Sequence, residues 1–167
     1  GATTISASGQ DITLDEAAST FGTLALIGAN VAVTDAGATD LGASTVSGTL
    51  GITSAGAVTD SGTLAITGAT TISASGQDIT LDEAASTFGT LALTGANVAV
   101  TDAGATDLGA STVSGTLGIT SGGAVTDSGT LAITGATTIS ASGQDITLDE
   151  AASTFGTLAL TGANVAV

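Results

Sequence analysis

Apolar residues alternate with small or polar residues in many short segments of the chain. The clearest are three-residue runs in which only the middle residue is small or polar: Ile79–Leu81, Leu91–Leu93, Val98–Val100, Leu117–Ile119 and Leu131–Ile133. Because successive side chains of a β-strand point to opposite faces, this period of two predicts strands with one buried face. Gly, Asn, Asp and Ser separate the runs, as is typical of turns. The best helical candidate, Asp82–Ser86, is too short to form a stable helix alone.

The strand segments recur because the chain repeats itself every 67 residues: the hexapeptide at Gly1 returns at Gly68 and at Gly135. Only two positions vary between copies, where the residues are Ile27, Thr94 and Thr161 at one and Ala55 and Gly122 at the other. We therefore divide one continuous column into a first repeat, a second repeat and a partial third repeat, which span residues 1–67, 68–134 and 135–167. Near-identical copies in a row are typical of a solenoid.

The strand spacing within one repeat predicts the architecture. About nine short strands fit into each repeat, and we interpret them as about three coils of roughly 22 residues, which form an all-β parallel β-helix, or β-solenoid. The segments between strands are too short for helical crossovers. A meander of hairpins is the alternative, since Gly and Asn form two-residue turns. At a strand spacing of about 4.8 Å, three coils predict an axial rise of roughly 14 Å per repeat.

The alternation also predicts which side chains form the core. Leu, Ile and Val are expected to point inward and to stack on the coils above and below. One Phe per repeat is expected to fill a wider corner of the core, with a ligand-binding role as the alternative: Phe21, Phe88 and Phe155. One Asn per repeat is expected to bond to the backbone at a corner or to supply turn geometry: Asn30, Asn97 and Asn164.

The outward positions of three segments combine Thr with Ala or Gly. They are Thr90, Ala92 and Thr94; Thr116, Gly118 and Thr120; and Thr130, Ala132 and Thr134. We expect flat, weakly charged strips, which can pack against a neighbouring column as stacked sheets do. An ordinary solvated β face is the alternative interpretation.

The composition then excludes several classes of function. The chain contains no Lys, Arg, His, Cys, Met, Trp, Tyr or Pro, and its 15 acidic residues give a net charge of −15. Without cations, nucleic-acid binding is not expected, and without His or Cys the usual ligands of zinc, iron and copper are missing. Most general bases and nucleophiles are missing too. We therefore predict a non-enzyme with no catalytic residues, no cofactor and no metal site. No apolar run is long enough for a membrane-spanning helix.

Carboxylates are the remaining source of chemistry, and the second repeat contains Asp78, Asp82, Glu83, Asp102, Asp107 and Asp127. The Gly-Gly-x-Gly-x-Asp repeat of calcium-binding β-rolls is absent, and Asp78 and Asp82 are expected about 13 Å apart along one strand. Asp82 with Glu83, or Asp102 with Asp107, remain pairs that meet across a turn. Carboxylate pairs also suit glycoside hydrolysis, but acids that recur in every copy do not resemble a single active site. We expect diffuse association with cations.

Four stretches resemble the repeats of giant filamentous-haemagglutinin-like exoproteins: Ser61–Ile66, Ser75–Leu81, Phe88–Leu91 and Leu108–Gly115. The resemblance covers the whole chain. It implies a right-handed parallel β-helix on the surface of a Gram-negative bacterium, export by a partner outer-membrane transporter, and a role as adhesin, fibre or stalk. The secretion and effector domains of that family have no counterpart in these residues, so the resemblance extends to the shaft alone.

These observations lead us to expect a structural, non-enzymatic shaft of a long bacterial extracellular fibre or surface adhesin. The expected partners are further copies of the column, joined end to end and side by side, and a cell or matrix surface. Because the sequence begins and stops within a repeat, we expect a window of a longer array. The alternative is a binding module, an adhesin or an ice- or glycan-binding solenoid, although Ala and Gly interrupt the regular Thr-x-Thr rows that ice binding requires.

Overall fold

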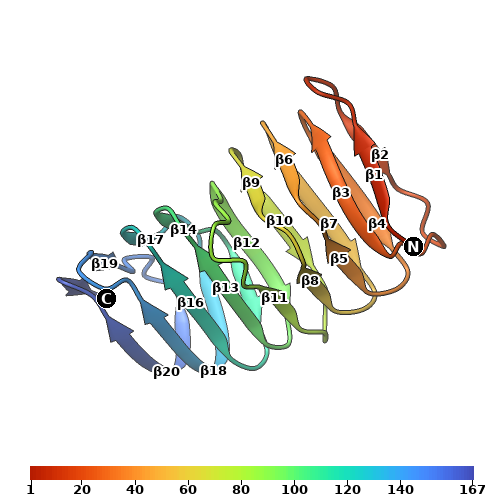
Figure 1. Ribbon diagram of the computed structural model, residues 1–167. Helices are drawn as coiled ribbons and strands as arrows, with labels where there is room; N and C mark the ends of the chain where they lie inside the picture. Colours follow the sequence, from red (N-terminus) through yellow and green to blue (C-terminus); the bar gives the residue numbers. More distant parts are fainter.

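The computed structural model describes all 167 residues and consists of 21 parallel β-strands, with no helix. The chain winds into stacked turns, with β1 at one end of the column and β20 near the other (Figure 1). Paired residues are separated by as few as 17 residues, as in Thr23 and Asp40, and as many as 22, as in Ala65 and Thr87. The predicted all-β parallel β-solenoid is therefore confirmed, and the hairpin meander is excluded because no pairing is antiparallel.

Two long ladders of hydrogen-bonded strands form the main sides of the column. Ladder 1 contains β1 (Thr3–Ser6), β3 (Thr23–Gly28), β5 (Thr39–Leu41), β8 (Val58–Asp60), β11 (Ile79–Leu81), β13 (Val98–Asp102), β16 (Leu117–Ser121), β18 (Leu131–Ser140) and β20 (Thr154–Thr161). Ladder 2 contains β2 (Ile12–Leu14), β4 (Val31–Asp35), β7 (Leu50–Ser54), β10 (Thr70–Ser73), β12 (Thr90–Gly95), β14 (Thr106–Leu108), β17 (Val125–Asp127), β19 (Ile146–Thr147) and β21 (Val165–Ala166).

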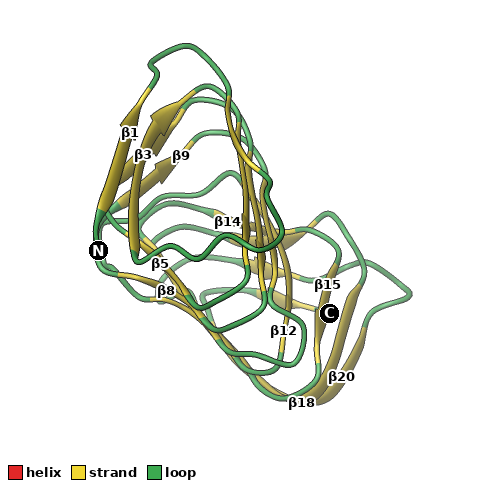
Figure 2. Ribbon diagram, turned by 90° about the vertical axis from the view of Figure 1, so that its right-hand side faces the viewer, coloured by secondary structure: helices red, strands yellow, loops and turns green.

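Shorter strands form the remaining sides. They are β6 (Ser44–Val46), β9 (Leu64–Ile66) and β15 (Ser111–Val113). The strand β6 stacks on the end of β3 in ladder 1, whereas β15 stacks on the end of β12 in ladder 2. The view at right angles to Figure 1 shows the turns overlapping around a common interior (Figure 2).

One sequence repeat makes three and a half turns of the solenoid, where we expected about three. Seven steps along ladder 1 lead from β1 to β18, in which Thr137 is the copy of Thr3 two repeats later. Equivalent strands of successive repeats consequently alternate between the ladders: β4 lies in ladder 2 and its copy β13 in ladder 1. At a strand spacing of about 4.8 Å, the axial rise per repeat becomes roughly 17 Å instead of 14 Å.

The turns contain fewer residues than expected because their corners are tight. Only Gly42 and Ala43 separate β5 from β6. Backbones stack closely at these corners, and a Cβ atom on Gly129 would lie 2.2 Å from the backbone nitrogen of Ala110 in the turn below. Gly76 turns another corner with a φ of +74°, a left-handed conformation that favours glycine. The glycines thus shorten each turn and allow close contact between turns.

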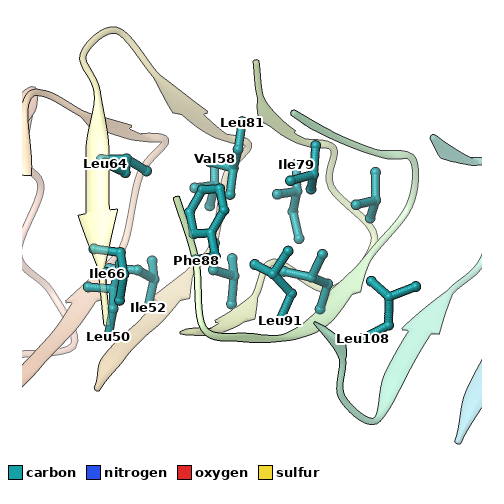
Figure 3. Close-up of a cluster of buried hydrophobic side chains, with 14 of the residues drawn as sticks. Leu50, Ile52, Val58, Leu64, Ile66, Ile79, Leu81, Phe88, Leu91 and Leu108 are labelled. Atoms are coloured by element: carbon teal, nitrogen blue, oxygen red, sulfur yellow. The ribbon is translucent and has the colours of Figure 1, made fainter. Parts of the chain in front are cut away.

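The interior is one continuous apolar core of 32 buried residues, stacked turn upon turn. Phe88 is 7% exposed and lies in this core beside Leu, Ile and Val side chains of neighbouring turns (Figure 3). Its copies Phe21 and Phe155 are partly buried against the same core. Full burial of each such aliphatic or aromatic side chain contributes about 1.5–3 kcal/mol to stability. No helix in the structure is long and apolar enough to span a membrane.

Candidate functional site

Two flat, uncharged strips of small side chains lie on the outer surface, one on each ladder. The strip on ladder 1 has an inner row of Thr80, Ala99, Gly118, Thr138 and Ala159 and a hydroxyl row of Thr101, Thr120, Ser140 and Thr161. The strip on ladder 2 consists of the same residues one repeat earlier: Thr13, Ala32, Gly51, Thr71 and Ala92, with Thr34, Thr53, Ser73 and Thr94. Because a repeat makes three and a half turns, the two strips lie half a turn apart around the column.

The structure confirms that the predicted Thr-, Ala- and Gly-containing positions face outward, but it distributes them over different sides. Ala92 belongs to the strip on ladder 2, whereas Gly118 belongs to the strip on ladder 1. Ala132 lies in the first part of β18 and stacks on β15, outside both strips. We expected these segments to form equivalent strips. The sequence does not reveal that equivalent strands of successive repeats lie half a turn apart around the column.

The strip on ladder 1 is hollowed at Gly118. A Cβ atom there would meet only the backbone oxygen of Val98, at 3.8 Å. The resulting hollow has a volume of about 190 Å³ and is bordered by the hydroxyls of Thr120 and Ser140 and by Asp82 at one end. Its open form provides little enclosure for a small ligand.

An aspartate lies in an outward row near each strip, and hydroxyl groups bind its carboxylate: Asp40 pairs with Thr59 on ladder 1, and Asp107 pairs with Thr90 on ladder 2. Asp107 accepts hydrogen bonds from Thr90 Oγ1 at 2.8 Å and from Ser128 Oγ at 2.8 Å. Asp40 makes the same contacts in the first repeat, with Thr23 Oγ1 at 2.7 Å and Ser61 Oγ at 2.8 Å. These carboxylates therefore link three successive turns.

The predicted corner role of the Asn residues is confirmed. Asn97 Nδ2 donates to Asp78 Oδ1 at 2.9 Å, and its Oδ1 accepts from the backbone nitrogen and the hydroxyl of Thr116, both at 3.1 Å. Asn30 makes the corresponding bonds in the first repeat. Asn30 and Asn97 thus each join one turn to the turns before and after it, whereas Asn164 bonds to Asp145 in the turn before it.

Asp102 points into the interior, where it is 1% exposed. Its carboxylate accepts from the Gly104 backbone nitrogen at 2.8 Å and from Thr106 Oγ1 at 3.2 Å. Burial raises the pKa of Asp102, although the hydrogen bonds from Gly104, Thr106 and the Phe88 backbone oppose the increase. Its neighbour Asp107 faces outward, so the expected meeting of Asp102 with Asp107 does not occur.

Asp60 also carries a buried carboxyl, and the residue is 8% exposed. Its Oδ1 accepts from the Asp82 backbone nitrogen at 2.8 Å, whereas its Oδ2 has no hydrogen-bond partner. Burial raises the pKa of Asp60, the backbone N–H groups of Asp82 and Glu83 lower it, and the charges of those two residues raise it further. The candidate pair Asp82 and Glu83 therefore lies beside a third carboxyl that we did not anticipate.

No group of three or more acidic side chains has an arrangement that could hold a metal ion. Asp78 and Asp82 lie at opposite ends of β11, where Asp78 binds Asn97 and Asp82 contacts Asp60 through its backbone. The alternation of the sequence already indicates these buried carboxyls. Asp60 and Asp102 lie two residues after the inward-facing Val58 and Val100, so their side chains point to the same face of the strand.

Comparison with protein families identifies one family, described as repeats of unknown function (DUF5649), which matches residues 1–27, 28–94 and 95–162. The middle match has the length of the sequence repeat. Comparisons with curated proteins and with solved structures gave no match. Since the three matched ranges cover almost all of the 167 residues, the chain belongs to this family of repeats.

Proposed function

We propose that this solenoid is a structural, non-enzymatic shaft of a bacterial extracellular fibre or surface adhesin, and that shafts associate side by side through their two strips. The observation that carries the proposal is the pair of uncharged strips, half a turn apart, on a chain of net charge −15. The resemblance to filamentous-haemagglutinin-like repeats supports the same setting, at the bacterial surface and outside the cell.

Small side chains make such association physically reasonable. Ala, Gly, Ser and Thr side chains allow two β faces to approach to roughly the 10 Å spacing of packed sheets. The inner and hydroxyl rows contain no charge, and the carboxylate that borders the ladder 1 strip, Asp82, lies at one end of it. Packing one strip on another therefore buries mainly uncharged side chains. Carboxylates elsewhere on the two columns repel each other, but salt screens them beyond about 8 Å at physiological ionic strength.

The positions of the strips define the geometry of the assembly. Strips on the same ladder recur after two repeats, or about 34 Å, and strips on the two ladders are offset by one repeat, or about 17 Å. A column that joins its ladder 1 strip to the ladder 2 strip of a parallel neighbour must therefore shift by about 17 Å. Because the strips lie half a turn apart, repetition of this contact produces a flat, staggered raft.

Charged substitutions in the strips test this proposal. Ala32→Lys and Ala99→Lys place one ammonium in the middle of each strip, and Ala38→Lys with Ala105→Lys places the same charge at exposed positions outside the strips. We expect the wild-type chain and the control to associate as salt is raised, measured by sedimentation velocity, and the strip variant to stay monomeric with unchanged β circular dichroism. Equal association of all three proteins would refute the proposal.

The hollow at Gly118 favours a second candidate, a binding module that presents its hydroxyl rows to a glycan or to ice. The row of Thr101, Thr120 and Ser140 has the spacing of successive turns. Binding of the monomeric chain to a glycan array or to ice, abolished by Gly118→Phe but not by Gly51→Phe, would favour this function at the ladder 1 strip. Loss with either substitution would assign it to both strips.

A further inference from the structure

The carboxyl of Asp60 connects two successive turns at a poorly paired part of the column. Asp60 ends β8, and its Oδ1 accepts the N–H of Asp82, the first residue of the eight-residue segment 82–89 between β11 and β12. The far end of this segment is held separately, by the bridge between Thr87 and Ala65, by a hydrogen bond from the Leu64 backbone nitrogen to Ser86 Oγ at 2.9 Å, and by the buried Phe88. The Asp60 carboxyl therefore anchors only the start of the segment, at Asp82 and Glu83.

This contact is unfavourable for an ionised carboxylate. Asp60 is more than nine-tenths buried, and its Oδ2 lacks a hydrogen-bond partner. The charged groups around it are all acidic: Asp82 and Glu83 on the segment, Asp78 before β11, and Asp40 on β5, which faces outward. The chain has no Lys, Arg or His to compensate them. A buried carboxylate beside like charges is destabilised relative to its neutral acid.

The same arrangement occurs in the next repeat. Asp127 is 7% exposed, its Oδ1 accepts the N–H of Asp149 at 2.8 Å, and its Oδ2 has no partner. Asp149 begins the copy of segment 82–89, with Glu150 next to it. Because of the half-turn between repeats, Asp60 lies on ladder 1 and Asp127 on ladder 2. The buried carboxyl and its contact with the following segment are therefore a property of the repeat and occur on both ladders.

We propose that Asp60 is a proton-operated clamp, which holds the start of segment 82–89, at Asp82 and Glu83, when its carboxyl is protonated and releases it when the carboxyl ionises. The folded state binds this proton at a higher pH than the unfolded chain does, because burial raises the pKa of Asp60. The clamp therefore stabilises the segment at acidic pH, and this stabilisation is lost as pH rises through the folded-state pKa. The inference is independent of lateral association.

Cleavage by a Glu-specific protease reports on the clamp, because the three glutamates of the chain, Glu16, Glu83 and Glu150, lie in the three copies of the segment. Cleavage after each residue gives fragments of different mass, although the three segments have the same sequence. The rates are measured on dilute wild-type chain between about pH 4.5 and about pH 7.5 and divided by the rate for an unstructured peptide of the segment. We expect the relative rate after Glu83 to rise with pH.

The Asp60→Asn substitution removes the titration and keeps the acceptor for the Asp82 N–H. We expect it to reduce the pH dependence at Glu83 and to leave the relative rate after Glu150 in the same molecule unchanged. Asp102, whose carboxyl accepts a hydrogen bond from the Phe88 backbone, accounts for any remaining pH dependence of the segment. Asp15→Asn, which removes one charge at an exposed position on the other ladder side of the column, should not change the pH dependence at Glu83.

Persistence of the wild-type pH dependence at Glu83 in Asp60→Asn would overturn the proposal. So would cleavage of the wild-type chain that is independent of pH, a measurement that requires no variant. Rapid cleavage at all three glutamates would reveal general unfolding of a variant. Titration of the wild-type Asp60 carboxyl by carbon-13 NMR would then decide: ionisation at or below the ordinary aspartate pKa excludes the clamp.

Discussion

The corner at Asn97 provides a quantitative test of how the turns are held together. Asn97→Ala removes three side-chain hydrogen bonds, one to Asp78 and two from Thr116. A hydrogen bond contributes about 0.5–1.5 kcal/mol net, and water replaces part of this at an exposed corner, so we expect a loss of about 1–2 kcal/mol. Gly115→Ala acts at the same corner, because its Cβ atom would lie 2.3 Å from Asn97 Oδ1 and 3.0 Å from the backbone oxygen of Ala96. We expect this overpacking to cost about 1–3 kcal/mol.

The two substitutions should not be additive. Asn97→Ala removes the oxygen that the new methyl group meets, and only the 3.0 Å contact with Ala96 remains. We therefore expect the double variant to be more stable than the sum of the single effects predicts, by at least about 1 kcal/mol. Urea unfolding followed by far-ultraviolet circular dichroism measures each free energy of unfolding.

Gly118→Ala combined with Asn97→Ala serves as the control for this double-mutant cycle. Gly118→Ala adds a methyl group in open space, where its Cβ atom meets only the Val98 oxygen at 3.8 Å. We expect it to change stability by less than about 0.5 kcal/mol and to be additive with Asn97→Ala. If Gly115→Ala and Asn97→Ala were also additive within about 0.5 kcal/mol, the stacking of Asn97 over Gly115 would be refuted.

Three further predictions follow from the core, the turns and the charges. Leu91 is fully buried, so Leu91→Ala should cost about 2–5 kcal/mol in urea unfolding, and a loss below about 1 kcal/mol would contradict the stacked core. Images of aligned columns should give a layer line near about 4.8 Å from the strand spacing. The axial repeat should be about 17 Å for one sequence repeat and about 34 Å for two, after which the same ladder recurs. A repeat of about 14 Å would instead indicate three whole turns per sequence repeat. Because burial raises the pKa of Asp102, the folded state takes up its proton at a higher pH than the unfolded chain, so the free energy of unfolding should rise as pH falls through that pKa. Asp102→Asn should weaken this rise, whereas an unchanged pH profile would show that Asp102 does not contribute.

Much of the fold could be predicted from the sequence because two simple features determine it. Alternation of apolar and small residues identifies strands and their inward faces, and Leu91 and Leu93 are buried as that pattern requires. Near-identical repeats favour stacking of equivalent strands. The number of residues in a turn was harder to predict, because it depends on how tightly each corner closes, as at Gly42 and Ala43.

The candidate surface could be predicted only in part, for the same reason. Outward positions follow from the alternation, but their side of the column depends on the accumulated length of every turn before them. Ala92 and Ala99 are only seven residues apart, yet they lie on different ladders. The buried carboxyls were missed because acids were expected to be solvated, although the phase of Val100 and Asp102 indicates otherwise.

The half-turn between repeats also explains how an irregular repeat can build a regular column. The pairing of Thr23 with Asp40 spans only 17 residues, so this turn is shorter than its neighbours on ladder 1. Its copy, the pairing of Thr90 with Asp107, is equally short but lies on ladder 2. If a repeat made a whole number of turns, every short turn would lie on the same side, and its effect would accumulate as a bend. With three and a half turns per repeat, the short turns of successive repeats lie on alternate sides of the column, so their bending effects oppose each other. The same geometry distributes the strips of small side chains to both sides.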